Sequence, residues 1–491
     1  MITWGISANS HDAALAVFKH SNLDFNLEFA SHSERYSGIK NDAHLHPDLI
    51  KQAKTYGEPD EVIWYERPFV KTLRQLRAGQ GFNFRENNIR SYLRSYGITA
   101  PIKYVDHHLS HAAAGYYTSS FREACVVCID SIGEFDTLTI WHGKEGRLKP
   151  IYKQKYPHSV GLWYSAITQR VGLKPQEDEY ILMGMAAYGD PDRLYHDIKS
   201  DFVEVGTKPL VKFKQNLHKG CLNWRPDLNT EQDYFDIAAA TQYVYEDILR
   251  WVLGHARCIC NTDNLVLMGG CALNCSANSI AYDYFKNVWI MPNPGDAGSA
   301  IGAPLAYYKK HITWKGPYLG HNIEGIYPVE KVLQELLTTG ICGVANGRAE
   351  FGPRALGHRS LLADPRHPAT KDRVNEIKQR QKFRPFAPAI LSEHVSSYFD
   401  GPCGPYMQYT STCKDTRLPA IIHGDGTSRV QTVSGRESMG FRKLLERWYE
   451  ETGCPVLLNT SLNIKGMPIV NDEQDAKDFE KRYGVKVFCT I

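Results

Sequence analysis

The sequence predicts an α/β fold in which a duplicated nucleotide-binding core precedes a second α/β domain. Three segments share the pattern that predicts the core, an apolar strand running into a tight or glycine-containing turn; they are residues 2–18, 124–141 and 265–270. The first has the pattern of a hairpin that opens a sheet, because two apolar runs flank a short turn. Helical segments separate the three units, so their repetition indicates a duplication.

The longest predicted helix covers residues 233–255, where apolar side chains recur at helical spacing. Residues 317–327 contain glycine and proline without a regular pattern, which is typical of a connection between domains. A helix is predicted next at 329–337 and a strand at 341–345, and the remainder is polar and rich in glycine and arginine, with few further helices expected. The predicted domains are therefore 1–325 and 326–491.

Composition is that of a globular protein and gives no global sign of a partner. The 491 residues are 43% hydrophobic and 23% charged, and a formal net charge of +3 does not predict binding to nucleic acid or a membrane over the whole surface. The sequence has neither a signal-peptide pattern nor the roughly 20-residue apolar run of a membrane span, so we expect a cytoplasmic protein. Twelve cysteines, many in apolar surroundings, predict buried thiols without disulfides.

A pair of histidines predicts a metal site. His107 and His111 are four residues apart, so a helix would point both imidazoles the same way. Asp296 precedes a run of small residues that could open a helix beside a ligand, and two imidazoles with one carboxylate form a catalytic type of site with open positions. Asp106 and His108 are candidates for orienting the ligands, with ordinary hydrogen bonding as an equal alternative.

Two turns at predicted strand ends could approach a nucleotide. Residues 130–134 are similar to the acidic, glycine-bearing turns that approach phosphates and their cation. Gly269 and Gly270 would let backbone amides approach a nucleotide beside Asn274, with packing of a helix N-terminus as the structural alternative. His11 lies in the first turn and is a candidate general base, because histidines titrate near neutral pH; a purely structural hydrogen bond is the alternative.

The second domain concentrates cationic side chains on turns with glycine and hydroxyl residues. One arginine guanidinium can bind two phosphate oxygens at once, and lysine acts as a point charge. Arginines set among Gly, Pro and Phe favour a phosphate pocket over a solvated basic face. Ser461 and Asn463 could hold the ends of a small planar group. The cationic candidates are Arg354, Lys378, Arg380, Arg384 and Arg429.

Together, motifs along nearly the whole chain resemble the O-carbamoyltransferase family, which includes nodulation-factor and antibiotic carbamoyltransferases. The first part is similar to a TsaD-like, actin-type duplicated domain. The second part is similar to a YrdC-like α/β domain, in which Lys378-x-Arg380 and Ser461-x-Asn463 match the KxR and SxN motifs. The matching stretches are residues 5–11, 106–111, 179–189, 269–274, 293–302, 350–366, 378–388, 425–432 and 458–470.

The resemblance implies an ATP-dependent O-carbamoyltransferase with two coupled reactions. In the second domain, carbamoyl phosphate and ATP would form carbamoyl adenylate, which is a better carbamoyl donor than carbamate. The residues implied in holding phosphates and carbamate there are Lys378, Arg380, Arg429, Ser461 and Asn463. Further contacts to the nucleotide are expected from Gly133, Glu134, Gly269, Gly270, Asn274, Arg354 and Arg384.

In the first domain, the resemblance implies a divalent metal held by His107, His111 and Asp296, with Asp130 as an additional candidate ligand. Iron is expected ahead of magnesium or manganese. His11 would help to deprotonate the acceptor hydroxyl, which attacks the carbamoyl carbon and expels AMP.

The acceptor stays open at this point. Ser131, Ile181 and Met467 stand where the family commonly has glycine, lysine and glutamate, and these departures affect substrate detail more than reaction type. Residues 67–103 combine eight cations and interleaved aromatic side chains with one acid, which could receive a phosphorylated or nucleic-acid acceptor such as a hydroxymethylated pyrimidine. A small molecule or sugar with a hydroxyl group is the alternative acceptor.

Two other functions compete with this prediction. Threonylcarbamoyl transfer to a tRNA adenine uses both domain types, but the fused order and the motif at residues 350–366 disfavour it. A catalytically silent nucleotide-binding scaffold is disfavoured because the candidate ligands His107, His111 and Asp296 are all present. No membrane partner is expected, and the sequence leaves a homodimer as an open arrangement.

Overall fold

The computed structural model describes residues 1–21, 24–436 and 438–490, which form two compact units. Unit 1 comprises Met1–Ser33 and Asn41–Trp314, and unit 2 comprises Glu34–Lys40 and the chain from Lys315 onward. Unit 2 begins ahead of the expected boundary at residue 325, because β13 (Tyr318–Ile323) pairs with β15 (Gly347–Glu350). The short helix α1 (Glu34–Ser37) also belongs to unit 2, although its sequence position lies within the first domain.

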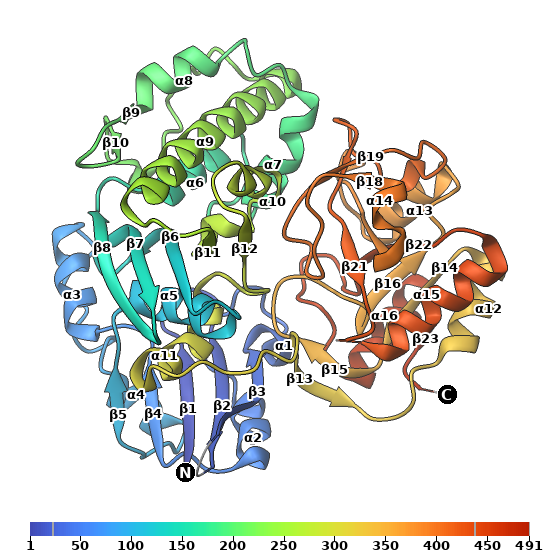
Figure 1. The fold of residues 1–491 in the computed structure, drawn as a ribbon, viewed down its shortest axis with the longest axis horizontal. Helices are drawn as coiled ribbons and strands as arrows, with labels where there is room; N and C mark the ends of the chain where they lie inside the picture. The colour runs from blue at the N-terminus through green and yellow to red at the C-terminus, as the bar shows by residue number, and fades with distance from the viewer. Residues whose placement is uncertain (22–23, 437, 491) are drawn as a thin grey trace. The chain divides into compact units, whose positions relative to one another are not determined.

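Unit 1 contains two five-stranded sheets with the same topology. Their strands can be followed in Figure 1. Each sheet starts with three antiparallel strands, and two further strands then add in parallel beside the first. The predicted α/β duplication is therefore confirmed. The first sheet consists of β1 (Ile2–Ser7), β2 (Ala14–His20), β3 (Phe25–His32), β4 (Glu61–Trp64) and β5 (Ile102–Tyr104); the second consists of β6 (Glu123–Gly133), β7 (Asp136–Lys144), β8 (Arg147–Lys155), β11 (Asn264–Met268) and β12 (Asn287–Trp289).

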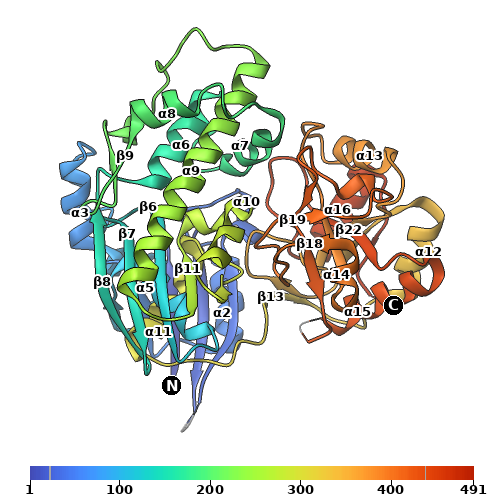
Figure 2. The ribbon, with the colours of Figure 1, turned by 45° about the horizontal axis from the view of Figure 1, so that its top comes forward.

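The predicted long helix of unit 1 is present as α9 (Glu231–Ile259). It starts at a capping box in which Thr230 and Asp233 satisfy each other's backbone N–H groups, and it packs beside α6, α7 and α8 (Figures 1 and 2). The other elements of unit 1 are α2 (Pro47–Tyr56), α3 (Pro68–Arg77), α4 (Ile89–Ser95), α5 (His107–Thr118), α6 (Val160–Arg170), α7 (Glu179–Met185), α8 (Tyr195–Phe202), α10 (Cys275–Asn278), α11 (Ser299–Tyr308), β9 (Val203–Val205) and β10 (Val211–Phe213).

Helices α5 and α11 occupy equivalent places, each following the last strand of its sheet, and they pack closely against each other. The approach requires Gly302, because a Cβ there would lie 1.9 Å from the Ser110 carbonyl oxygen of α5. The start of α11 is therefore fixed against the first turns of α5. This contact brings together two segments that are nearly two hundred residues apart in the sequence.

Unit 2 is built on a six-stranded mixed sheet with the order β21-β17-β22-β16-β14-β23. Alternate residues of β14 (Ile341–Ala345) enter two separate cores, one beneath α12 and α15 and the other beneath α13 and α16. The remaining elements are α12 (Val329–Thr339), α13 (Ala369–Ile377), α14 (Val395–Tyr398), α15 (Met439–Thr452), α16 (Glu473–Tyr483), β16 (Arg359–Ala363), β17 (Ala387–Leu391), β18 (Phe399–Asp400), β19 (Ser411–Cys413), β20 (Thr427–Ser428), β21 (Gln431–Val433), β22 (Val456–Ser461) and β23 (Val487–Phe488).

The expectation of few helices in the second domain is wrong. In α15, Phe441, Leu444, Leu445 and Trp448 are buried at helical spacing, but charged residues on the outer face obscure this stripe in the sequence. Helix α16 buries only Ala476 and Phe479 fully, which leaves too few apolar positions for a periodic signal.

Two further sequence expectations concern cysteines and the membrane. All twelve cysteines are free thiols, and seven of them are buried. Within the described residues, no helix combines the length and the apolar character needed to cross a bilayer.

Candidate metal centre and cationic cluster

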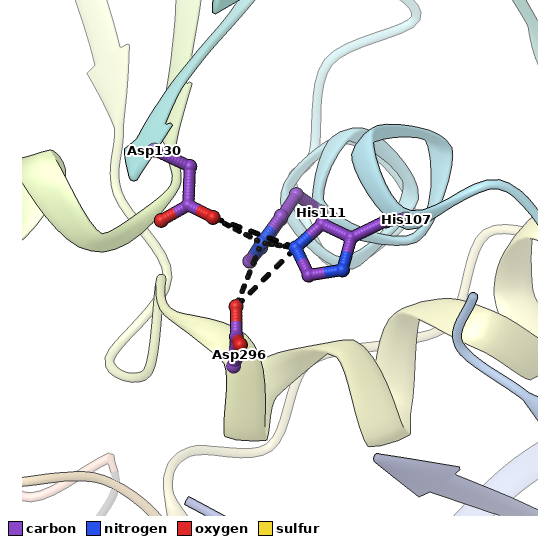
Figure 3. A group of neighbouring side chains, drawn as sticks. All are labelled: His107, His111, Asp130 and Asp296. Carbon is purple, nitrogen blue, oxygen red and sulfur yellow. Dashed lines mark hydrogen bonds and ion pairs between the residues drawn. The ribbon is translucent and has the colours of Figure 1, made fainter. Parts of the chain in front are cut away.

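Helix α5 presents His107 and His111 on one face, as their spacing predicts (Figure 3). Both side chains are buried, and their Nε2 atoms lie 3.0 Å apart. Two imidazole nitrogens at this distance converge on one point. The arrangement is therefore a candidate pair of metal ligands.

Two carboxylates from other elements complete the cluster. Asp130 lies on β6, and Asp296 lies in the single turn of 3₁₀ helix that precedes α11. One Asp296 oxygen is 3.3 Å from the Nε2 atom of each histidine, and one Asp130 oxygen is 3.4 Å from His107 and 3.8 Å from His111. The four ligand atoms lie within 4.8 Å of one another.

These separations suit a transition metal. Metal bonds of about 2.1 Å place neighbouring ligand atoms roughly 3.0 to 3.4 Å apart in octahedral or tetrahedral sites. Most contacts of the cluster fall in this range. The two-histidine, two-aspartate donor set found in the structure extends the predicted set by Asp130, which was expected only as an additional candidate.

The cluster is strongly polarised. Burial opposes charge on His107, but Asp296 and Asp130 outweigh burial and raise the pKa of His107 well above its usual range. The two aspartates also raise the pKa of His111. The histidines in turn hold the pKa of Asp130 well below its usual value, against the effect of burial. His108, by contrast, has its pKa lowered by burial and by neighbouring His107. The negative charge of the aspartates therefore favours a cation between them.

Of the two alternatives stated for Asp106 and His108, the structure shows ordinary polar contacts. Asp106 pairs with Arg67 at 2.9 Å, and His108 contacts the Thr139 hydroxyl at 2.9 Å, so both make ordinary hydrogen bonds or ion pairs. The nearest acid to the far nitrogen of His107 is Glu66, whose oxygen lies 4.0 Å from Nδ1. Sequence reasoning missed Glu66; the available signal was an acidic residue just beyond parallel strand β4, where ligand sites tend to form.

Lys71 fixes Glu66 beside the cluster. Its ammonium group donates to Glu66 at 2.7 Å and also to the Asn9 carbonyl and the Ser10 hydroxyl. Both Glu66 and Lys71 are buried. The first hairpin, α3 and the histidine helix are thus linked by one polar network.

The residues of unit 1 that were predicted to bind nucleotide, and the predicted base His11, make contacts within the protein. The Gly270 N–H donates to an Asp130 oxygen at 3.0 Å, and the Gly269 N–H donates to the Pro294 carbonyl. Asn274 exchanges hydrogen bonds with Gln242. The other predicted residues are Glu134, which accepts from Arg67 at 2.9 Å, and His11, whose Nε2 lies 2.9 Å from the Gln176 carbonyl.

Gly133 has a direct packing role beside the cluster. A Cβ at this position would lie 2.1 Å from Cδ2 and 2.5 Å from Cγ of His107. The glycine therefore leaves room for the His107 ring in its observed place. This contact explains a glycine at the end of β6 without reference to a nucleotide.

In unit 2, Lys378 forms a compact group with Ser461 and Asn463, as the paired motifs suggest. The Lys378 ammonium donates to the Ser461 carbonyl at 2.5 Å, to the Ser461 hydroxyl at 3.1 Å and to the Asn463 side-chain oxygen. Burial, together with Arg380 and Arg384, lowers the pKa of Lys378 well below its usual range. Five of the predicted residues of this unit are therefore neighbours.

The remaining arginines are partly fixed by the protein. Arg380 donates to Asn375 at 2.9 Å, and its guanidinium lies 4.2 Å from the centre of the Phe386 ring. Arg354 and Arg429 lie on other loops, one after β15 and one between β20 and β21. Both are partly buried, and Arg429 Nε is buried without a hydrogen-bond partner in the described part of the chain.

The two units thus define an α/β protein with a candidate metal centre in one unit and, in the other, a buried lysine beside partly buried arginines. Two family models match the sequence: the carbamoyltransferase N-terminus over residues 66–305 and the carbamoyltransferase C-terminus over residues 333–490. The chain belongs to the carbamoyltransferase family, and it is an enzyme of that class.

Related proteins match over most of the chain. The Synechocystis protein sll1178 is 32% identical over 96% of this chain and 93% of its own length. Nodulation protein NolO of Bradyrhizobium diazoefficiens is 32% identical over 76% of this chain and 75% of its own length, and nodulation protein NolNO of Sinorhizobium fredii is 33% identical over 76% and 61%. The crystal structure of full-length HypF overlays with a TM-score of only 0.37 at 12% identity, covering 63% of this chain and 46% of HypF, and adds nothing to the assignment.

Proposed function

We propose that this carbamoyltransferase is ATP-dependent. Hydrolysis of carbamoyl phosphate gives carbamate and orthophosphate, and the carbamate oxygen then attacks the α-phosphorus of ATP, so that pyrophosphate leaves and carbamoyl adenylate forms. The enzyme transfers the carbamoyl group of this adenylate to a hydroxyl group of an acceptor. The observation that carries the proposal is the presence of two chemically different clusters, a buried lysine among arginines and a histidine–aspartate centre. The first suits phosphate and carbamate groups, and the second suits a metal ion. One chain therefore has separate groups for activation and for transfer.

Activation is assigned to unit 2. Arg380 and Arg384 supply positive charge to triphosphate and carbamoyl phosphate, while Ser461 and Asn463 orient the planar carbamate through hydroxyl and amide groups. Lys378 is held between these two sets of residues. Arrival of an anion favours the charged form of this lysine, so that the ammonium stabilises the negative charge that develops during adenylate formation. Arg354 and Arg429 are proposed as further phosphate contacts.

Transfer is assigned to unit 1. His107, His111, Asp130 and Asp296 would hold a divalent ion, for which their mixed nitrogen and oxygen donors favour iron over magnesium or manganese. Such an ion would supply positive charge that offsets the adenylate phosphate. Backbone amides of the turn at Gly269 and Gly270 are proposed to lie near the nucleotide.

His11 is proposed to accept the proton of the acceptor hydroxyl. Its side chain lies on the turn between β1 and β2, and Nε2 is held by the Gln176 carbonyl. A neutral imidazole donates to this carbonyl from Nε2, which leaves Nδ1 as the proton acceptor. The acceptor oxygen then attacks the carbamoyl carbon, and AMP leaves.

A mass measurement tests the proposed function. The protein is incubated with ATP, carbamoyl phosphate and a panel of hydroxylated acceptors, and each acceptor is examined for the gain of one carbamoyl group together with AMP release. We expect product only when ATP and carbamoyl phosphate are both present. Product formed without ATP would contradict the adenylate route, and a requirement for threonine and tRNA would indicate threonylcarbamoyl transfer instead.

Gly133→Ala is expected to weaken metal binding about tenfold, because the added methyl group displaces the His107 ring from its observed place. Gly295→Ala is the matched control: it lies beside Asp296, yet nothing is within 4 Å of its added Cβ. Metal content after dialysis against graded chelator concentrations, measured by elemental analysis, compares the variants. Equal metal retention in the two proteins would contradict the role of Gly133 in placing His107.

A further inference from the structure

Helix α3 has its apolar side chains on the outside. Phe69, Leu73 and Leu76, at helical spacing, are 62%, 41% and 52% exposed, whereas Lys71 and Arg74 on the opposite face are buried. The polar network around Glu66 explains the buried lysine, because it is part of the support of the histidine centre. No contact within the described chain explains the exposed apolar stripe. A solvent-facing stripe of this kind marks an interaction site.

The segment that follows α3 adds two aromatic rings to this stripe. Phe82 and Phe84 are 62% and 55% exposed, and their rings are stacked at a centroid distance of 6.0 Å and an angle of 5°. Both ends of this segment are hydrogen-bonded to α3. Arg74 donates to Gln80, and Asn87 donates to Thr72 and Gln75.

The same stretch of sequence carries exposed cations. Arg77, Arg85, Arg90 and Arg94 are exposed, and none has an ion-pair partner among the described residues. Between residues 67 and 103 the sequence has only one acid, Glu86. Helix α3 lies at the outer edge of unit 1 (Figures 1 and 2), and α4 lies near β5 in Figure 1. We call this region the α3 surface: Phe69, Leu73, Leu76, Arg77, Phe82, Phe84, Arg85, Arg90 and Arg94.

We propose that the α3 surface binds a single strand of nucleic acid, with phosphates against its arginines and bases against its exposed aromatic rings. Both components of the surface are needed for this partner, because single-strand binding combines a cationic path with stacking platforms. An uncharged amphiphile would use the apolar stripe but leave four arginines without a counter-charge. A single phosphate would occupy only one or two of them, whereas the helix alone extends over about 15 Å.

The buried face of α3, opposite this surface, connects to the candidate metal centre through Lys71 and Glu66. Arg67, just before the helix, holds Glu134 through its side chain and its backbone N–H, and it also pairs with Asp106 beside His107. The next step rests on the proposed function: the bound strand is the carbamoyl acceptor. A hydroxyl group on it forms a new C–O bond to the carbamoyl carbon, the C–O bond to the adenylate phosphate breaks, AMP leaves, and the hydroxyl proton passes to His11.

Binding is measured with the full chain and a fluorescently labelled single-stranded DNA oligonucleotide at several salt concentrations, without ATP. We expect R77Q/R85Q to bind more weakly and to reduce the slope of log K against log[salt] by roughly 1.4. F82A/F84A should bind about tenfold more weakly with the slope unchanged. The control R147Q/K149Q removes the same charge from exposed positions on β8 and should match the wild type.

The outcomes separate this proposal from the proposed function. Absence of binding at low salt, or equal effects of R77Q/R85Q and R147Q/K149Q, would overturn the α3 surface as a nucleic-acid site. A second arm supplies ATP and carbamoyl phosphate with an oligonucleotide that carries a primary hydroxyl on one base. Carbamoylation of a neutral sugar but not of this oligonucleotide would overturn the acceptor assignment alone, whereas absence of AMP release with every acceptor would count against the proposed function itself.

Discussion

His111→Ala is expected to stop carbamoyl transfer while pyrophosphate release from ATP and carbamoyl phosphate continues. The residue belongs to the four-ligand cluster in unit 1, and the residues proposed for activation lie in unit 2. Loss of one imidazole leaves three ligand groups and an uncompensated pair of carboxylates, so transfer should fall by at least about 100-fold. Pyrophosphate release and carbamoylated acceptor are measured in the same single-turnover reactions.

His108→Asn is the matched control on the same helix. His108 lies next to the cluster in sequence but contacts Thr139, and an asparagine amide can replace that hydrogen bond. This variant should keep its metal, as measured by elemental analysis, and should keep most of its transfer activity. If His111→Ala lowers activation and transfer equally while His108→Asn lowers neither, the separation of the two reactions is wrong.

Lys378→Met is expected to have the opposite effect and to lower the rate of adenylate formation roughly 1000-fold. The lysine contributes the buried charge closest to Ser461 and Asn463, and methionine fills similar volume without an ammonium group. ATP- and carbamoyl-phosphate-dependent pyrophosphate release reports the loss. Lys382→Met, on the exposed part of the same loop, should leave the rate unchanged, and equal rates for all three proteins would contradict the assignment.

The wild type and Lys378→Met are expected to differ in how their thermal stability depends on pH. Because the pKa of Lys378 is lowered in the native state, the native protein binds fewer protons at this site than the unfolded chain. Relative to Lys378→Met, the wild type should therefore gain thermal stability as pH rises from the native pKa towards the unfolded value near 10.4, and lose it as pH falls. A difference in melting temperature that does not change with pH would contradict the burial of this amine.

The clustering of the four candidate metal ligands could be predicted from sequence because its signals are local. Two histidines four residues apart require only a helix, and Asp130 and Asp296 stand where predicted strands and helices begin or end. Glu66 has no such spacing signal, and its role depends on how β4 lies beside β1 and on the lysine that holds it. Its place just beyond β4 makes it a candidate site residue, but the fold is needed to show that it lies beside the cluster.

The fold was predictable to a similar degree and for similar reasons. The duplicated sheet repeats apolar strands and glycine turns, whereas α16 consists almost entirely of polar residues and depends on Ala476 and Phe479 for its attachment. Helix α3 reverses the usual pattern, since Lys71 and Arg74 are buried while the leucines face solvent. Such an arrangement arises when polar support of a site outweighs apolar burial, and the sequence pattern alone does not reveal it.

Removal and restoration of the metal distinguishes an activation site in unit 2 from a metal-dependent transfer site in unit 1. The protein is treated with a chelator selective for transition metals and returned to buffer that contains Mg²⁺ for ATP, and pyrophosphate and carbamoylated acceptor are followed in single turnovers. We expect that pyrophosphate still forms, that acceptor product disappears, and that stoichiometric Fe²⁺ restores the acceptor product. Unchanged transfer by metal-free protein, or parallel loss of both products, would contradict an activation site and a transfer site with separate chemistry.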